Sequence, residues 1–372
     1  MPPAGYDVVV LGAGAAGCAV AYYLTRQGVR PLLVERDALA SHASGFALGG
    51  LAPSEGVFPY GDAYHPITRA AFTLHYTLHP LLQEETGIST EFRMTQSLHL
   101  ALTEEQEAEL RETLAWQSRH GFRVRWIDAQ EARSIEPRLT PALRGAVHNQ
   151  DTAMLDPYKL VLALVQAVEQ RGGMVRHGEA VGLVVDKGQV RGVRLRSGEV
   201  IPCDRVVVAL GPWMGLVPWL GIPVPVRPLK GQILRLRHPG PPLGADLWWG
   251  IGYAASKPDG LIWVGTTEED IGFHEAPTPE VRHYLLEEAW RVLPDLGEAQ
   301  VVLQTACLRP LSADNLPIIG PVPGLRGAYV AGGAGRKGIL LCTAMGKAIA
   351  DLITQGYTDI PIGPFGLERF AR

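Results

Sequence analysis

The chain begins with an apolar run that stops abruptly at a cluster of glycines. Residues 6–11 read as a buried strand, and residues 12–17 are glycine- and alanine-rich. We expect a helix over residues 15–27 and a second apolar strand over residues 31–34, which ends at Glu35. Strand, turn, helix and strand in this order predict a parallel α/β unit at the start of the fold.

Helical periodicity returns in four later stretches. Residues 104–119 form a charged amphipathic pattern with a solvated face. Residues 156–171 carry clear end signals, with Asp156 as N-cap, Pro157 in the first turn and Gly172-Gly173 as the stop. The remaining predicted helices are residues 279–293 and 338–354, the latter preceded by a strand at 327–331 and the glycine turn 332–335.

Short strands separated by turn residues fill the middle of the chain. We expect residues 180–185, 190–196 and 205–210 to form a β-meander, because Asp186-Lys187-Gly188 and Ser197-Gly198 are turn signals. Further strands are predicted at residues 232–237, 248–254 and 261–266, with a hairpin turn at Pro258-Asp259-Gly260.

Length and charge narrow the class of protein. A chain of 372 residues predicts two domains, and 47% hydrophobic with 19% charged residues suits a soluble enzyme with a large core. The net charge of −4 argues against a nucleic-acid partner, which usually requires a basic surface. Low charge also suits an enzyme of small metabolites.

The cysteines and the apolar segments indicate the cellular location that we expect for the protein. The four cysteines are far apart and form no CxxC pair, so we expect no metal site and a reducing, cytoplasmic location. No charged segment precedes the first strand, and we therefore expect no signal peptide. Residues 206–226 are uncharged and long enough to span a bilayer, but four prolines would break such a helix. We interpret them as a buried strand and a proline-rich crossover, not an integral membrane segment.

The opening turn is a complete dinucleotide fingerprint. Gly12 permits the tight turn, Gly14 admits a pyrophosphate, and Gly17 lets the helix pack closely on the strand. The helix N-terminus offers free N–H groups to phosphates. Glu35 is placed to accept the ribose hydroxyls. The motif by itself leaves FAD and NAD as alternatives. The glycine- and serine-rich residues 40–60 follow the second strand, where a loop can wrap the cofactor.

Several segments together resemble a known family. They are the fingerprint with Glu35, the segments 155–160 and 206–211, the run Leu308-Arg309-Pro310 with residues 314–320, and residues 332–341. With these the chain resembles the FAD-dependent D-amino-acid oxidase superfamily, closest to the glycine oxidase and sarcosine oxidase-like amine oxidoreductases. The resemblance selects FAD as the cofactor.

The resemblance implies an α/β fold in two domains. It predicts a Rossmann-like FAD-binding domain, discontinuous over residues 1–84, 145–220 and 305–372. The substrate-binding domain, α+β and built on an antiparallel sheet, is expected over residues 85–144 and 221–304. From the fingerprint and the resemblance together we expect these residues to bind FAD: Gly12, Gly14, Ala15, Ala16, Gly17, Glu35, Arg36, His42, Ser44, Gly49, Gly50, Val181, Gly211, Cys307, Gly333, Gly335, Arg336, Lys337, Gly338 and Ile339.

Three residues carry the implied catalysis. Arg309 falls on the carboxylate-binding arginine of the family, and a guanidinium grips a carboxylate through two parallel hydrogen bonds. Tyr253 matches a substrate-facing tyrosine, and Arg336 an arginine near the site mouth. The resemblance implies hydride transfer from the substrate to flavin N5, with the helix after Gly335 stabilising the negative charge on the flavin.

Four positions need separate comment. Cys307 and His42 resemble positions that link covalently to flavin in sarcosine oxidase and in the related dehydrogenases; otherwise each is a neighbour of the cofactor. Trp263 replaces the lysine that assists oxygen in sarcosine oxidase. Glu268 replaces an apolar pocket residue of glycine oxidase and is either a selector of basic substrates or a solvated loop residue.

We therefore expect oxidative deamination of a small amino acid or secondary amine, such as glycine, sarcosine or a D-amino acid. Oxygen is the favoured electron acceptor. The alternative is a D-amino-acid or proline/amine dehydrogenase that passes electrons to a quinone or a protein. A flavin-binding subunit without its own site is a further alternative, disfavoured because Arg309 and Arg336 are both present. The sequence leaves the oligomeric state open.

Overall fold

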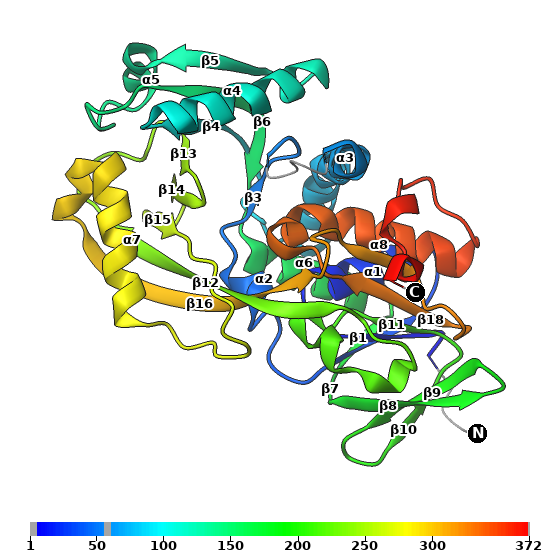
Figure 1. Cartoon of the computed structure of the whole chain (residues 1–372). Helices are drawn as coiled ribbons and strands as arrows, with labels where there is room; N and C mark the ends of the chain where they lie inside the picture. The colour runs from blue at the N-terminus through cyan, green and yellow to red at the C-terminus, as the bar shows by residue number, and fades with distance from the viewer. Residues whose placement is uncertain (1–5, 56–60, 371–372) are drawn as a thin grey trace.

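The computed structural model describes residues 6–55 and 61–370, which form two halves that lie side by side (Figure 1). The part of the expected cofactor loop at residues 56–60 lies outside the described residues. One half, here the parallel half, is built on a six-stranded sheet. The other, the antiparallel half, is built on a nine-stranded sheet. The fold is mixed α/β, as the sequence predicts.

The sheet of the parallel half combines strands from the first, middle and last parts of the chain. In spatial order its strands are β17 (Ile318–Pro321), β18 (Ala328–Gly332), β11 (Val206–Val208), β1 (Val8–Leu11), β2 (Pro31–Glu35) and β7 (Met174–His177). All neighbours are parallel except β17 and β18. Strand β1 lies near the centre of this sheet. Open α/β sheets bind ligands just outside the carboxyl ends of their central strands, so we expect a ligand at the end of β1.

Alternate residues of β1 enter two separate cores. Val8 and Val10 face the helical layer, whereas Val9 and Leu11 face the opposite side of the sheet. The helices that supply the first core are α1 (Ala15–Arg26), α3 (Gly61–Thr86), α6 (Pro157–Gln170) and α8 (Gly338–Thr354). Helices α1 and α8 pack closely, because a Cβ on Gly346 would lie 2.6 Å from the backbone of Ala19.

The second core is closed by a small sheet. Its strands are β8 (Ala180–Asp186), β9 (Gln189–Leu195) and β10 (Val200–Pro202). The predicted meander is therefore wrong in its third strand. The segment expected there, residues 205–210, contributes β11 to the six-stranded sheet instead. Its continuous Val206-Val207-Val208 run is buried on both faces, which is typical of a central parallel strand.

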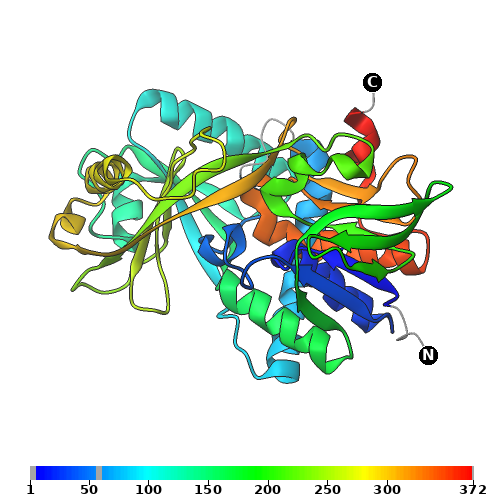
Figure 2. The same ribbon diagram turned by 90° about the horizontal axis from the view of Figure 1, so that it is seen from below.

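The antiparallel half has a long strand pair at one edge. Its strands follow the order β16 (Gln300–Ser312), β12 (Val226–Arg237), β15 (Ile262–Gly265), β14 (Gly252–Ser256), β13 (Asp246–Trp249), β4 (Arg93–Ala101), β6 (Gly145–Met154) and β3 (Gly50–Leu51), with β5 (Val124–Asp128) beside β6. Helices α4 (Glu104–Arg119), α5 (Ala129–Ile135) and α7 (Pro279–Val292) belong to this half. In both views β12 and β16 run from this half toward the other (Figure 1, Figure 2).

Local sequence signals explain several element ends. Asp156 caps α6 by accepting from the Lys159 N–H at 3.0 Å, and Pro157 occupies its first turn. The predicted strand at residues 248–254 is wrong as a single element. It is the β13–β14 hairpin, because Gly250 adopts a positive φ of 57° and turns the chain.

The predicted domain boundaries stay a prediction. Two strands bear on them directly. Strand β6, which the prediction assigns to the FAD-binding domain, pairs within the nine-stranded sheet. Strand β16 runs without a break across residue 305, where the prediction places a domain boundary. Among residues 6–55 and 61–370, no helix combines the length and apolar character needed to cross a bilayer.

Candidate active site and cofactor cleft

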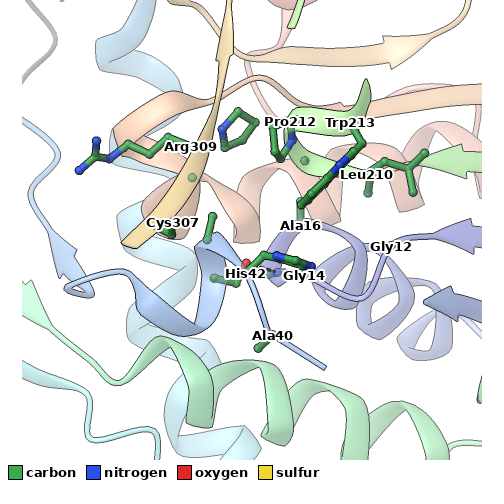
Figure 3. Close-up of a pocket in the computed structure, with 18 of the residues that line it drawn as sticks. Gly12, Gly14, Ala16, Ala40, His42, Leu210, Pro212, Trp213, Cys307 and Arg309 are labelled. Atoms are coloured by element: carbon green, nitrogen blue, oxygen red, sulfur yellow. Dashed lines mark hydrogen bonds between the residues drawn. The ribbon is translucent and has the colours of Figure 1, made fainter. Parts of the chain in front are cut away.

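A cleft of about 530 Å³ is lined by residues of both halves. It extends from the glycine turn after β1 to Arg309 on β16. Figure 3 shows Gly12 and Gly14 on one side of it and Arg309 on the other, with Trp213 and His42 near the glycine turn. The volume lies within the range of about 300–1,000 Å³ that is usual for ligand and cofactor pockets.

The glycine turn is fixed by steric exclusion. Gly12 has a φ of +99°, and a Cβ there would lie 2.5 Å from the Ala209 carbonyl oxygen. A Cβ on Gly17 would lie only 1.9 Å from the Gly12 carbonyl oxygen. Gly14, the N-cap residue of α1, has no side chain that could cap the helix. Apart from the Ala15 N–H, which Ser44 engages, the first turn of α1 therefore presents backbone N–H groups to the cleft, where they can bind phosphate.

Glu35 ties the turn to the end of β2. Its Oε2 accepts a hydrogen bond from the Ala13 N–H at 2.7 Å, and its Oε1 accepts from the Asp37 N–H at 2.9 Å. These bonds orient the carboxylate at the wall of the cleft. Its role toward a ribose stays a prediction.

The loop after β2 closes one side of the cleft. Ser44, in the short helix α2 (Ala43–Phe46), accepts from the Ala15 N–H at 2.9 Å. Lys257 reaches across from the antiparallel half and donates to the carbonyl oxygens of Leu48, at 2.8 Å, and Leu155, at 2.6 Å. Burial lowers the pKa of Lys257 to about 8. The loop is thus held by both halves.

His42 lies between two carboxylates. Its Nε2 is 2.9 Å from Asp37 Oδ2, and its Nδ1 is 3.0 Å from Glu275 Oε1. The ring also meets the Trp213 ring edge-on, at 4.7 Å between centroids. Because both ring nitrogens are engaged, His42 joins the cofactor loop to Glu275 of the antiparallel half. The covalent link considered for His42 would require one of these contacts to break.

Arg309 is held by neutral acceptors. Its Nη1 donates to the Thr267 carbonyl oxygen at 3.0 Å, and its Nη2 donates to Thr266 Oγ1 at 2.6 Å. The guanidinium lies over Gly231 on β12, where a Cβ would be 2.2 Å from Nη2. The sequence signal for this contact is a glycine within an otherwise regular strand, which marks the close approach of another group.

Arg336 lies at the start of α8 and is paired differently. Its Nε donates to Glu268 Oε1 at 2.6 Å. Burial alone would raise the pKa of Glu268, but the hydrogen bond and charge of Arg336, with Arg309 beyond, hold that pKa below its ordinary value. Glu268 is thus an ionised ion-pair partner on an exposed loop, which agrees with the expectation of a solvated loop residue. The alternative expectation, that it selects basic substrates, stays a prediction.

One segment, residues 266–278, supplies contacts to Arg309, Arg336 and His42, and we call it the strap. Thr266 and Thr267 hold Arg309, Glu268 holds Arg336, and Glu275 holds His42. The strap is itself fixed to β12: Lys230 Nζ donates to the Ala276 carbonyl oxygen at 2.7 Å. Backbone bonds also join Lys230 and Glu269 in both directions. It reaches the cleft from the antiparallel half.

Tyr253 lines the cleft beside these arginines. Its ring packs against Gly265, where a Cβ would lie 2.5 Å from the hydroxyl oxygen, and against Trp248 at 5.1 Å between centroids. Burial raises the pKa of Tyr253 although both Arg309 and Arg336 act to lower it. The hydroxyl is therefore a neutral donor at all ordinary pH values.

Cys307 and Trp263 occupy different layers. Cys307 lines the cleft, and burial raises the pKa of its thiol while Arg309 acts to lower it. Trp263 packs behind cleft residues Leu48, Ile233 and Tyr253. The Arg235 guanidinium lies 4.0 Å and the Lys257 ammonium 5.3 Å from the centre of its ring. Positive charge is thus present at the Trp263 position although the indole supplies none.

Most of the expected FAD-binding residues line the cleft, and four do not. Gly17 packs beneath the turn, and Val181 is replaced at the wall by its neighbour Ala180. Gly333 packs among the side chains of Ser312, Ile318 and Val226. Lys337 is half-buried and donates to the Ala52 carbonyl oxygen at 2.9 Å. Desolvation lowers its pKa to about 8, against the opposing effect of Glu55.

Sequence reasoning missed an apolar group of lining residues. They are Trp213, Leu216, Val217 and Trp219 from the segment after β11, and Ile233, Trp248 and Ile251 from the antiparallel half. The first four lie in the uncharged stretch read only as a proline-rich crossover. Their signal was the Gly211-Pro212-Trp213 sequence directly after a parallel strand, at the carboxyl edge of the sheet.

Comparison with known proteins defines the family. Residues 7–352 match the DAO family model, described as FAD dependent oxidoreductase, and the chain belongs to this family. A glycine oxidase of Pseudomonas aeruginosa is 32% identical over 96% of this chain and 97% of its own. A hydrogen cyanide synthase subunit HcnC of the same species is 30% identical over 98% of this chain and 96% of its own.

A solved structure gives the same result for the fold. The crystal structure of glycine oxidase from Geobacillus kaustophilus superposes with a TM-score of 0.93, at 28% identity and over 98% of both chains. The protein is therefore an FAD-dependent oxidoreductase. The cleft suits FAD, because the glycine turn and the start of α1, at Gly12, Gly14, Ala15 and Ala16, line it and Gly14 brings no side chain to the helix N-terminus.

Proposed function

We propose that the protein oxidises a small amino acid or secondary amine, such as glycine, sarcosine or a D-amino acid, to its imino acid. Water then hydrolyses the imine. The observation that carries this proposal is Arg309, a guanidinium at the far end of the cleft from the glycine turn whose contacts are neutral oxygens. Its charge is available to a substrate carboxylate. The names of the relatives described above support an amino-acid substrate.

Each nearby residue has a limited task. Arg309 binds the carboxylate, and the neutral Tyr253 hydroxyl donates a second hydrogen bond that orients it. Bound FAD supplies the redox chemistry by accepting a hydride from the substrate α-carbon. The amine must be neutral beforehand, and solvent takes its proton. Gly338 and Ile339, the first residues of α8, line the cleft, and the positive end of this helix favours negative charge there.

The test is anaerobic bleaching of the flavin. Glycine, sarcosine, D-alanine and L-proline are mixed with the oxidised holoenzyme, and loss of the flavin absorbance identifies the substrate. We expect at least one of these compounds to bleach the flavin. Failure of all of them, with FAD bound, would contradict the proposed function.

We propose oxygen as the acceptor, in line with the oxidases among the relatives. Air and an artificial dye are offered separately to the bleached enzyme. Reoxidation by the dye alone would instead favour the dehydrogenase alternative.

We further propose that FAD is held without a covalent bond. Acid precipitation should release the flavin into the supernatant. Colour that stays in the pellet would contradict this, and Cys307→Ala and His42→Ala variants would then identify the attachment point.

A further inference from the structure

Two arginines face the substrate end of the cleft, but they differ in what balances their charge. Arg309 donates only to a backbone carbonyl and a hydroxyl. Arg336 donates to the carboxylate of Glu268. Both line the cleft and both act on the pKa of Tyr253. The lining of the substrate end therefore includes two arginines, and one of them, Arg336, is paired with the carboxylate of Glu268 on the adjoining strap.

The Glu268–Arg336 pair contributes little to folding. The two side chains are 32% and 46% exposed, and ion pairs at such positions typically stabilise a protein by less than about 1 kcal/mol. The pair does, however, decide how much positive charge the site presents. With Glu268 ionised, only Arg309 remains to attract an anion.

We propose that Glu268 is a specificity-determining residue: by holding Arg336, it limits the substrate to a single carboxylate group. This inference rests on the proposed function, and it names the substrate class as monocarboxylate amines. A second carboxylate, on the side chain or on the amine substituent, would approach Arg336 only by displacing Glu268. The displaced carboxylate and the incoming one would then repel each other.

The same geometry disfavours a basic substrate. A substrate ammonium or guanidinium would have to compete with Arg336 for Glu268. Arg336 has the advantage, because it belongs to the same chain and already donates to Glu268. Glu268 is a positioning residue, because it acts on the substrate through Arg336.

The experiment compares ligands that differ by one carboxylate. In the oxidised holoenzyme, perturbation of the flavin spectrum gives Kd for acetate and for malonate, and kcat/KM is measured for sarcosine and for iminodiacetate. Glu268→Gln keeps the shape of the side chain but removes its charge. We expect the variant to bind malonate roughly tenfold more tightly relative to acetate, the gain of about one charge-assisted hydrogen bond. The KM for iminodiacetate should fall by a similar factor relative to the KM for sarcosine.

Three further variants separate charge from structure. Asp270→Asn removes a strap carboxylate that pairs with Arg227 at 2.8 Å and should not alter the ligand preference. Glu268→Asp keeps the charge and should keep the preference for one carboxylate. Addition of Arg336→Met to Glu268→Gln should abolish the gain.

Unchanged malonate and iminodiacetate preference in Glu268→Gln would overturn the inference, as would equal affinity of the parent for acetate and malonate. The Kd comparison does not require turnover. If no amine bleaches the flavin but the malonate gain is seen, the proposed function fails and the charge assignment stands.

Discussion

The two halves of the molecule build their ends of the cleft in different ways. The glycine turn, α1 and Glu35 come from about thirty consecutive residues, and steric exclusion around Gly12 and Gly17 fixes them. The substrate end is assembled from β14, the strap, β16 and the start of α8, and charges hold it together. We propose that the first end binds the cofactor through backbone groups, and that the second selects the substrate through side chains that can be exchanged singly.

Buried charge is concentrated in the antiparallel half, although Asp351 on α8 of the parallel half is also buried and pairs with Lys347. In the antiparallel half, Asp246 and Lys257 are both buried among other ionisable groups, and Lys230 is fully buried beside Glu269. The central strand of the parallel half, Val8–Leu11, is entirely apolar and buried. The comparison predicts that shape changes damage the cofactor end, whereas charge changes damage the substrate end.

The largest effect is expected from Gly17→Ala. The added Cβ would lie 1.9 Å from the Gly12 carbonyl oxygen, so α1 must move away from β1 and the phosphate cradle must widen. We expect a purified protein that retains little FAD, measured as the ratio of flavin to protein absorbance. The control is Gly297→Ala, where a Cβ meets nothing within 4 Å. Full FAD content in Gly17→Ala would refute the steric account of this end.

Arg309→Ala should have the next largest effect, and it should weaken substrate binding without changing FAD binding. Loss of a charge-assisted contact costs about 1.5–3 kcal/mol, which is roughly a tenfold to hundredfold increase in KM. Arg309→Lys should lie between parent and Ala, since lysine keeps the charge but not the two-pronged geometry. FAD content should stay at the parent level in both variants. Parent-like kinetics in both would move the carboxylate role to another residue.

Asp246→Asn should stabilise the fold in a pH-dependent way. Burial raises the pKa of Asp246 to about 6, from an ordinary value of 3.8, against the effects of Thr95, Arg93 and Lys257. The neutral form is thus preferred in the folded state. The cost of ionisation appears as pH rises above the ordinary value and is complete above about pH 6. We expect the variant to gain about 1–2 kcal/mol of unfolding free energy at pH 7.5 and almost nothing at pH 4, by denaturant titration. An equal gain at both pH values would contradict a role for the charge.

The smallest effect is expected at the contact between the halves. Glu275→Gln removes one of the two carboxylates beside His42 but keeps a hydrogen-bonding side chain of the same size. Partly exposed ion pairs contribute little, so we expect FAD to dissociate roughly two to five times faster. Release of flavin fluorescence on dilution measures this rate. A slower rate than in the parent would show that the contact opposes cofactor retention.

The same contrast explains what the sequence could predict. The cofactor end could be predicted from the sequence because each of its signals, such as Gly12, Gly17 and Glu35, is local and lies next to a strand or a helix. The strap was not, because its effect depends on contacts such as Glu268 with Arg336, which are separated by 68 residues. The third strand of the predicted meander was misplaced for a related reason: a run of valines does not specify which sheet it joins. The β13–β14 hairpin was missed because Gly250 and Gly252 read as strand residues between aromatic neighbours.

The order of strands in the parallel half bears on how the protein is made. Strand β1 and helix α1 are synthesised well before two of their partners, β11 and α8. The face of α1 that meets Gly346 therefore stays uncovered until α8 has been made. The helical layer that packs against β1 and α1 is therefore complete only once α8 has been synthesised.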